Sequence, residues 1–268
     1  MPELPEVETI VRQLNKKVLN KKIVKVEILD YSFVESKIKN IAPAVIKKVW
    51  RRAKYIFFEL GNHFLLVHLG MTGHFHYVPK GKEADLKSCE KFIMFKFYLN
   101  DGSLLTHNSV RKFGQVKLLD REKFQQKLNS LGIEPLSREF TLELFTTMLS
   151  KKKKSNLKTL LMDQDFIAGI GNIYAQEALY HAGISPLRKA GDLTSSKVKK
   201  LHLSIRKILK SAIEHHGTTV ESYVHIEGSG GYQKYLTVYG KKDCPKGHPV
   251  KKIFLGGRGT YYCSKCQG

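Results

Sequence analysis

The first residues of the chain combine a proline with a carboxylate. Pro2 and Glu3 follow Met1, and removal of Met1, which a small second residue permits, leaves a proline with a free secondary amine. An α-amino group has a reference pKa of about 8, so a useful fraction of it is neutral and nucleophilic at physiological pH. A secondary amine that attacks a sugar or aldehyde carbon forms an iminium ion, which is an electron sink. The alternative is that Pro2 and Pro5 only begin a helix, because proline is well placed in a first turn.

A second group of reactive side chains lies near the end of the chain. Cys244 and His248 are separated by three residues, and Cys263 and Cys266 by two. This spacing is typical of a two-stranded zinc ribbon with a closed tetrahedral site. A catalytic zinc is disfavoured because four protein ligands leave no open position. We therefore expect one structural zinc ion, with Arg258 at the tip of the hairpin between the two ligand pairs.

The charge of the chain predicts a polyanionic partner. Lys and Arg number 46 against 24 Asp and Glu, which gives a net charge of +22. Such an excess favours phosphate contacts and counterion release. An anionic membrane is the rival partner, but we find no convincing basic helix with a bulky apolar face and no apolar run of membrane-spanning length. The acidic N-terminus does not resemble a signal peptide, which argues against export and predicts an intracellular protein.

Hydrophobic periodicity predicts an α+β fold. A helix is expected over 3–18, and tight turns at Gly61-Asn62 and at 100–102 predict hairpins. Strands joined by such turns imply an N-terminal antiparallel β-sandwich with flanking helices. The expected strands are 23–28, 54–60, 63–69, 92–99, 103–106 and 115–119, and the expected later helices are 140–149, 157–162, 172–181 and 195–215. The predicted domains are a sandwich (1–133), a helical domain (134–236) and a zinc finger (237–268), which is too small to fold without its metal.

Three loops carry residues suited to DNA. Met71 lies between two glycines, where an apolar wedge can enter a base stack, although Met is more often a core residue. Arg111, Lys112 and Phe113 lie in a second loop, which is otherwise a cationic turn with a buried Phe. The 160–174 segment reads as helix, glycine turns, helix, and Asn172 is the expected N-cap of a phosphate-binding helix end. Lys153 and Lys158 lie just upstream, but an ordinary corner between two helices fits this segment equally well.

Taken together, these motifs closely resemble the bacterial formamidopyrimidine-DNA glycosylase family over the whole length of the chain. The opening MPELPEVET in front of a helix–two-turn–helix is highly specific, and it favours the purine-lesion branch over the endonuclease-VIII-like branch. The other motifs that carry the resemblance are RRAKY at 51–55, HLGMTG at 68–73, RKFG at 111–114, LLMDQ…AGIGNIYAQEAL at 160–179, GTT at 217–219, VYG at 238–240 and the terminal cysteine–histidine group.

The resemblance implies a glycosylase and abasic-site lyase that extrudes a damaged nucleotide from double-stranded DNA. Pro2 would attack the anomeric carbon and expel the base, Glu3 would shuttle protons to the sugar, and successive β- and δ-elimination would cut both phosphate bonds. It also implies a monomer in the bacterial cytoplasm, associated with the nucleoid, that needs no small-molecule cofactor. The remaining implied roles are proton donation and phosphate contact for Lys54, the second elimination for Arg258, filling of the vacated base stack for Met71, Arg111 and Phe113, DNA contact for Lys112, and phosphate binding for Lys153, Lys158 and Asn172.

Three departures from the family pattern stand out. His248 replaces the usual second cysteine, Phe92 occupies a position that is often basic or histidine, and the 225–232 loop (HIEGSGGY) differs in the region that contacts the flipped lesion. The last departure puts the preferred lesion in doubt. Two alternatives therefore stay open: a protein that binds damaged DNA without catalysis, and a glycosylase for oxidised pyrimidines.

Overall fold

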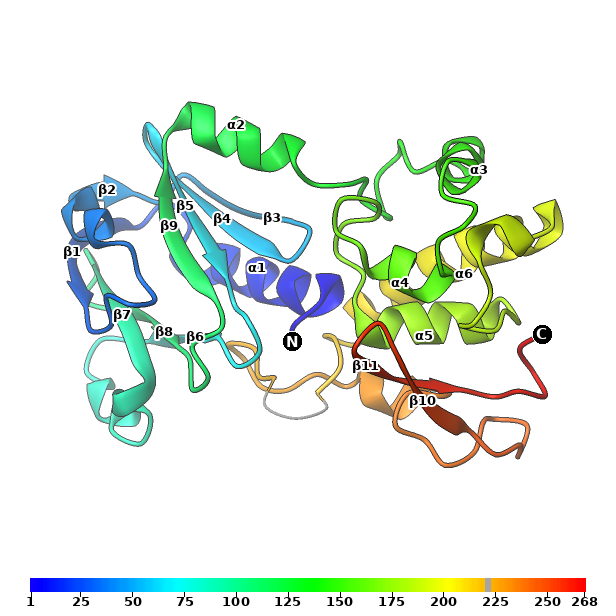
Figure 1. Ribbon diagram of the computed structural model, residues 1–268. Coiled ribbons are helices and arrows are strands. Elements are labelled where there is room, and N and C mark those ends of the chain that lie inside the picture. The colour runs from blue at the N-terminus through cyan, green and yellow to red at the C-terminus, as the bar shows by residue number, and fades with distance from the viewer. Residues whose placement is uncertain (220–222) are drawn as a thin grey trace. The chain divides into compact units, whose positions relative to one another are not determined.

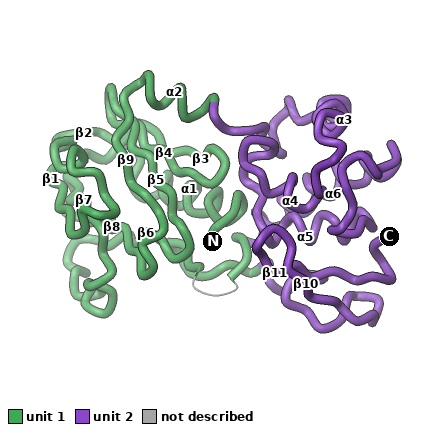
Figure 2. The backbone as a smooth tube through the Cα atoms, in the orientation of Figure 1, with its two compact units in different colours: residues 1–129, 216–231 green, residues 130–215, 232–268 purple. Residues whose placement is uncertain are grey.

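In the computed structural model, which describes residues 1–219 and 223–268, the chain forms two units (Figure 2). The first comprises residues 1–129 and 216–231, and the second comprises residues 130–215 and 232–268. The sequence assigned residues 216–231 to the helical domain. In the structure this segment packs with the first unit because it makes hydrogen bonds with the N-terminal helix.

Two antiparallel sheets form the first unit, as the hairpin turns predicted (Figure 1). The five-stranded sheet has the order β2-β1-β7-β8-β6, and the four-stranded sheet has the order β3-β4-β5-β9. The strands are β1 (Lys22–Ile28), β2 (Ala44–Val45), β3 (Lys48–Arg52), β4 (Tyr55–Leu60), β5 (His63–His68), β6 (His74–Val78), β7 (Ile93–Leu99), β8 (Leu104–Asn108) and β9 (Gln115–Leu119). Short 3-10 turns cover Ser36–Ile41, Glu83–Leu86 and Glu90–Phe92.

The core of this unit lies between the two sheets and is completed by α1 (Leu4–Val18). Val7, Ile10 and Leu14 recur at helical spacing and are fully buried in it. The outer face of the four-stranded sheet is covered by α2 (Arg121–Asn129), which the sequence did not predict. Phe124 stacks on Phe64 with ring centroids 4.0 Å apart. Since α2 has no fully buried residue, its periodicity is weak in the sequence.

The second unit is built on four helices, all close to their predicted bounds: α3 (Leu142–Ser150), α4 (Leu157–Met162), α5 (Asn172–His181) and α6 (Ser195–Glu214). Thr141, Asn156 and Thr194 cap the first, second and last of them through their side-chain oxygens. The cap of α5 is Gly171, so the prediction that Asn172 is an N-cap was wrong. Short 3-10 turns cover Ala190–Asp192 and Tyr232–Tyr235.

A two-stranded ribbon, β10 (Lys251–Leu255) and β11 (Arg258–Tyr262), completes this unit. Gly256 and Gly257 form its turn with φ angles of 58° and 71°, in the left-handed region that glycine adopts without strain. Arg258 pairs with Leu255 across the turn and therefore lies at the tip of the hairpin, as predicted. None of the helices formed by residues 1–219 and 223–268 has the length and apolar character needed to span a membrane.

Candidate functional site

The start of α1 holds Pro2 and Glu3 in a buried position. Glu3 precedes the helix, is only 2% exposed, and its backbone N–H donates to Glu6 Oε2 at 2.7 Å. Pro5 occupies the first turn, where its missing N–H has no helical acceptor to lose. Met1 is 43% exposed, so it is accessible for removal. The local sequence therefore presents the proline and the carboxylate together on a rigid helix end.

The GTT segment packs against the same helix end. The Thr218 N–H donates to Glu6 Oε1 at 2.7 Å, and the Tyr223 hydroxyl donates to the Glu6 carbonyl at 3.2 Å. Gly217 has a φ angle of 79°, and a Cβ added there would lie 2.7 Å from Glu6 Oε1. Glycine is needed at this position for both reasons. Glu6, which the sequence did not single out, thus connects α1 to a segment more than 200 residues away.

Strand register brings three of the sequence motifs to one end of the four-stranded sheet. Tyr55 pairs with His68, and His68 pairs with Gln115 on the far side. Lys54, 5% exposed, immediately precedes Tyr55, the HLGMTG loop follows His68, and the RKFG loop precedes Gln115. Because paired residues lie side by side across a sheet, Lys54 and the two loops must be neighbours in this unit.

The turn that carries Lys54 is fixed to α1. Arg51 donates to Glu8 Oε2 at 3.1 Å and to the Ala53 carbonyl at 3.1 Å. His68 borders the same turn, and burial, followed by the charges of Lys54 and Lys127, lowers its pKa to about 4. The imidazole is therefore neutral at physiological pH. In this state its Nδ1 accepts the N–H of Gly70, at 3.3 Å, and orients the loop that follows.

The Met71 loop and the Arg111–Phe113 loop lie against each other. A Cβ at Gly70 would lie 2.5 Å from the backbone nitrogen of Gly114, so the two backbones are in close contact. Thr72 Oγ1 accepts the N–H of Arg111 at 2.9 Å. Phe113 is 62% exposed and the Arg111 guanidinium lies 4.9 Å from its ring centroid. Phe113 is thus an exposed aromatic, and the alternative of a buried Phe in a cationic turn was wrong.

Two further predicted residues of this unit have defined surroundings. The Lys112 ammonium lies 2.6 Å from Asp30 Oδ2, and its hydrogen bond, followed by that from Ser32, lowers the pKa of the Asp30 carboxyl. Lys112 has a φ angle of 51°. Phe92 ends a 3-10 turn directly before β7, and the Lys91 ammonium lies 5.0 Å from its ring centroid.

In the second unit the ribbon tip meets the helix–two-turn–helix. Asn172 Nδ2 and Gln176 Nε2 both donate to the Gly259 carbonyl, at 3.1 and 3.2 Å. A Cβ at Gly256 would lie 2.7 Å from Thr159 Cγ2, which places the turn on α4. Asn172 and Arg258 therefore belong to one surface. Lys153 is exposed before α4, whereas Lys158 is fully buried in it, so no phosphate reaches the Lys158 side chain in this conformation.

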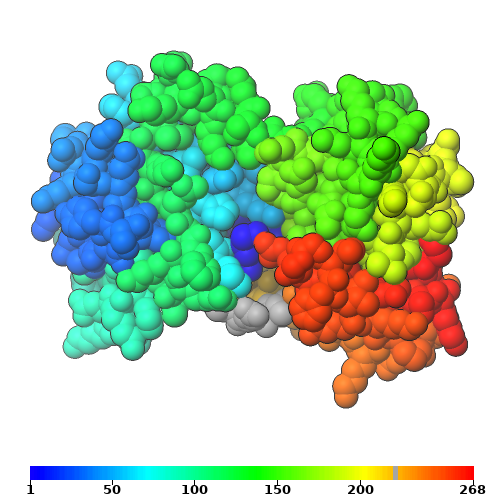
Figure 3. All heavy atoms as spheres, viewed as in Figure 1, coloured from blue at the N-terminus to red at the C-terminus, as the bar shows by residue number. Residues whose placement is uncertain are grey.

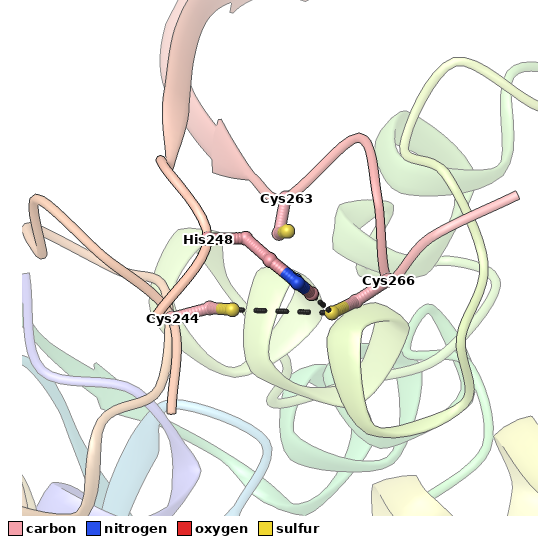
Figure 4. A group of neighbouring side chains, drawn as sticks. All are labelled: Cys244, His248, Cys263 and Cys266. Carbon is pink, nitrogen blue, oxygen red and sulfur yellow. Dashed lines mark hydrogen bonds between the residues drawn. The ribbon is translucent and has the colours of Figure 1, made fainter. Parts of the chain in front are cut away.

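The four predicted metal ligands converge in the second unit (Figure 4). The ligand atoms of Cys244, His248, Cys263 and Cys266 all lie within 4.8 Å of one another. His248 Nδ1 lies 3.3 Å from Cys266 Sγ. Burial alone would raise the pKa of Cys244, but hydrogen bonds from the backbone N–H groups of Lys246 and His248 lower it to about 6, which favours the thiolate that metals bind.

One buried carboxylate in the second unit has no counterpart in the sequence analysis. Glu177 is fully buried in α5, and its oxygens accept from Thr237 N and Oγ1 at 2.8 and 2.6 Å, Val238 N at 3.0 Å and Tyr239 N at 2.9 Å. It therefore anchors the segment that leads into the β10–β11 ribbon. The only signal in the sequence was position: Glu177 lies within the 160–179 motif, and its partners Val238 and Tyr239 lie within the VYG motif at 238–240.

Two sequence profiles match the chain. The formamidopyrimidine-DNA glycosylase N-terminal domain matches residues 1–116, and the formamidopyrimidine-DNA glycosylase H2TH domain matches residues 131–224. Formamidopyrimidine-DNA glycosylase of Shouchella clausii is 40% identical over 280 residues, covering 100% of this chain and 99% of the relative. The Bacillus subtilis protein of the same name is 38% identical, with the same coverage.

The chain belongs to the formamidopyrimidine-DNA glycosylase family, and so it is a DNA-repair glycosylase. Solved structures of this family have the same fold. The Lactococcus lactis Fpg in complex with DNA containing an abasic site superposes with a TM-score of 0.90 at 33% identity, covering 99% of both chains. The MutM (Fpg) protein of Thermus thermophilus superposes with a TM-score of 0.87 at 36% identity, covering 99% of this chain and 98% of that one.

Proposed function

We propose that this family member is bifunctional: it excises oxidised purines, namely 8-oxoguanine and formamidopyrimidines, from double-stranded DNA and then cleaves the strand. The observation that carries the proposal is the buried pair Pro2 and Glu3 at the start of α1, behind an exposed Met1. The net charge of +22 supports a DNA partner. So do the complexes of the Lactococcus lactis relative with abasic-site DNA and, as a mutant, with Fapy-dG DNA.

The proposed chemistry begins once Met1 is removed. The lone pair of the Pro2 nitrogen forms a bond to C1′ of the damaged nucleotide, and the base leaves with the electrons of the glycosidic bond. Glu3 transfers a proton to the sugar as its ring opens, and loss of the amine proton leaves an iminium ion. The iminium acidifies C2′, so that β-elimination breaks the bond to the 3′ phosphate. A second, δ-elimination breaks the bond to the 5′ phosphate, and hydrolysis of the iminium frees Pro2.

The remaining predicted residues position the DNA in this proposal. Met71, Arg111 and Phe113 fill the space that the extruded nucleotide leaves, and the contact between their loops supports a joint action. Lys112 lies in the second of these loops and contacts the DNA backbone. Lys54 contributes a phosphate contact and a proton. Phosphate contacts in the second unit are proposed for Lys153, Lys158 and Asn172, of which Lys158 must first become accessible. Arg258, at the tip of the ribbon, assists the second elimination. The enzyme acts as a monomer in the cytoplasm.

The metal in this proposal is one zinc ion that holds the ribbon. The donor set of three cysteines and one histidine fits tetrahedral zinc, and the mutual approach of the four ligand atoms within 4.8 Å supports such a site. Four protein ligands leave no position for substrate. The metal therefore supplies only folding energy, and the ribbon in turn presents Arg258.

Borohydride trapping tests the nucleophile. Reduction of the reaction on a duplex with an abasic site or an 8-oxoguanine lesion is expected to give a covalent adduct, which peptide mapping places on the N-terminal peptide without Met1. Blocking the amine with an N-terminal tag should abolish both activities and leave DNA binding intact. Glu3→Gln should suppress base excision more than cleavage of a preformed abasic site, because only the first step needs its proton transfer. Full activity of the tagged enzyme, or an adduct on Lys54, would contradict the assignment.

The two alternatives have distinct outcomes in the same assays. A protein that only binds damaged DNA gives no borohydride adduct on any substrate. An oxidised-pyrimidine glycosylase gives the adduct on Pro2 but cleaves thymine glycol duplexes faster than 8-oxoguanine duplexes. A panel of duplexes with different lesions and opposing bases therefore decides the substrate preference that the unusual 225–232 loop leaves open.

A further inference from the structure

A second group of sulfur and imidazole side chains lies on the five-stranded sheet. His74 and His76 are two residues apart on β6, so their side chains project from the same face, while Phe75 between them is buried in the core. Cys89 precedes the last 3-10 turn before β7, and its sulfur lies 3.8 Å from Nδ1 of His76. All three residues are half-buried. Figure 3 shows the segment around residues 83–92, in teal, at the surface of the first unit.

The separation of the thiol and the imidazole matches a shared metal ion. With Zn–S of about 2.3 Å and Zn–N of about 2.0 Å, a sulfur and a nitrogen on tetrahedral zinc lie about 3.6 Å apart. The ribbon cluster has similar separations, with Cys266 Sγ 3.3 Å from His248 Nδ1 and 3.9 Å from Cys244 Sγ. The 3.8 Å between Cys89 and His76 falls in this range. An ion can therefore bind between these two atoms with little movement of either side chain.

His74 is oriented to supply a third ligand. Its Nδ1 lies 3.0 Å from the Thr72 carbonyl oxygen, which can only accept, so Nδ1 carries the proton and Nε2 keeps its lone pair. Histidines that bind metals commonly donate their other ring nitrogen to a backbone carbonyl in this way. The rings of His74 and His76 lie 4.8 Å apart between centroids, close enough for one nitrogen of each ring to reach a shared ion.

The donor set selects the class of ion. One thiolate and two imidazoles suit zinc, whereas magnesium and calcium prefer oxygen ligands. Asp85 and His76 line the same cavity, of about 510 Å³, through which solvent ions reach the site, and the Asp85 carboxylate favours a cation there. Three protein ligands leave one tetrahedral position for water, so the ion should exchange more readily than one held by four ligands.

We propose that His74, His76 and Cys89 form an exchangeable zinc site on the five-stranded sheet, separate from the site proposed for the ribbon. His74 binds through Nε2, His76 through Nδ1 and Cys89 through its sulfur, and the thiol proton passes to solvent as the Zn–S bond forms. The hydrogen bond that the thiol donates to the Leu86 carbonyl, at 3.4 Å, is lost in exchange. Occupancy of this site does not depend on the proposed glycosylase chemistry.

The zinc content of the full-length protein tests the site. The protein is dialysed against zinc that is buffered by a weak chelator, and the bound metal is counted by atomic absorption. The wild type should hold one zinc ion more than Cys89→Ser, and one more than His76→Ala. His63→Ala removes an exposed histidine of the same unit and should bind as much zinc as the wild type. Because the ion is counted as a difference between proteins, the result is independent of the metal in the ribbon.

Alkylation of the thiol gives a second readout. Cys89 is the one cysteine of the sequence outside the group Cys244, Cys263 and Cys266, and peptide mapping after iodoacetamide treatment follows it separately from them. Zinc should slow its modification about tenfold in the wild type, because a bound thiolate is no longer a free nucleophile. His74→Ala should show little of this protection. Equal unfolding temperatures without added zinc establish that the variants are folded.

Three outcomes would overturn the site. The first is an equal zinc content of the wild type and Cys89→Ser, or an alkylation rate that zinc does not change. The second is a loss of zinc in His63→Ala as large as that in His76→Ala, which would show adventitious binding to surface histidines. The third is protection of Cys89 that persists in both His74→Ala and His76→Ala, since the ion would then be held by the thiol without the imidazoles.

Discussion

His107 lies in the middle of β8 and is fully buried. Its ring stacks on Phe95, with centroids 5.6 Å apart and planes at 5°, and on Phe33 at 5.3 Å. Neither ring nitrogen has a hydrogen-bond partner among the described residues. Burial, followed by the charge of His74, lowers the pKa of His107 to about 3. The side chain is therefore neutral in the folded protein over the whole physiological range.

The free energy of unfolding should consequently fall in acid. Below about pH 6.5 the unfolded chain binds a proton at His107 that the folded protein rejects until about pH 3, so stability is lost across this window as the pH falls. Between pH 7 and 5 this amounts to about 2 kcal/mol. His107→Phe keeps an aromatic ring without a titrating nitrogen, so urea unfolding should show a correspondingly smaller difference between the two pH values. An identical pH dependence in both proteins would show that His107 is not the group responsible.

The β10–β11 ribbon contains one unusual candidate metal ligand. His248 stands where a cysteine is common in the family pattern, and its Nδ1 faces Cys266 (Figure 4). A ribbon of this size has only a small core, around Val238, Cys244 and Cys263. A zinc ion held by these four residues would therefore supply much of its stability.

His248→Ala should lose the metal or bind it weakly, and cleavage of lesion DNA should decline with it because Arg258 is no longer held in place. Atomic absorption should give one zinc ion per chain for the wild type and much less for the variant after dialysis. His63→Ala, at an exposed histidine of the first unit, serves as the matched control and should keep its zinc. Unchanged zinc content in His248→Ala would mean that another group completes the site.

At the scale of the whole molecule, the net charge of +22 predicts salt-sensitive binding. If about six phosphates are neutralised, log K should fall with log salt at a slope of about −5. Titrations of a lesion duplex between low and physiological salt measure this slope. A slope near zero would show that the basic residues lie outside the interface.

The sequence by itself determined the features that depend on local chemistry. The helix at 4–18 follows from apolar spacing and an early proline, the hairpins follow from their turn residues, and the convergence of the four candidate metal ligands follows from two short spacings. Each of these signals lies within about twenty residues of the chain. They are readable because turn geometry and side-chain periodicity are set by neighbouring residues.

Only the tertiary structure decided the features that depend on distant partners. Lys158 and Phe254 are exceptions to ordinary burial: a lysine is fully buried and a phenylalanine is largely exposed. Residues 216–231 leave the helical unit because Glu6 supplies the acceptor for Thr218. Strand register, which brings Lys54 beside two distant loops, likewise depends on pairing across the sheet. Burial and pairing are properties of the packed chain, since residue type sets only a preference that long-range contacts override.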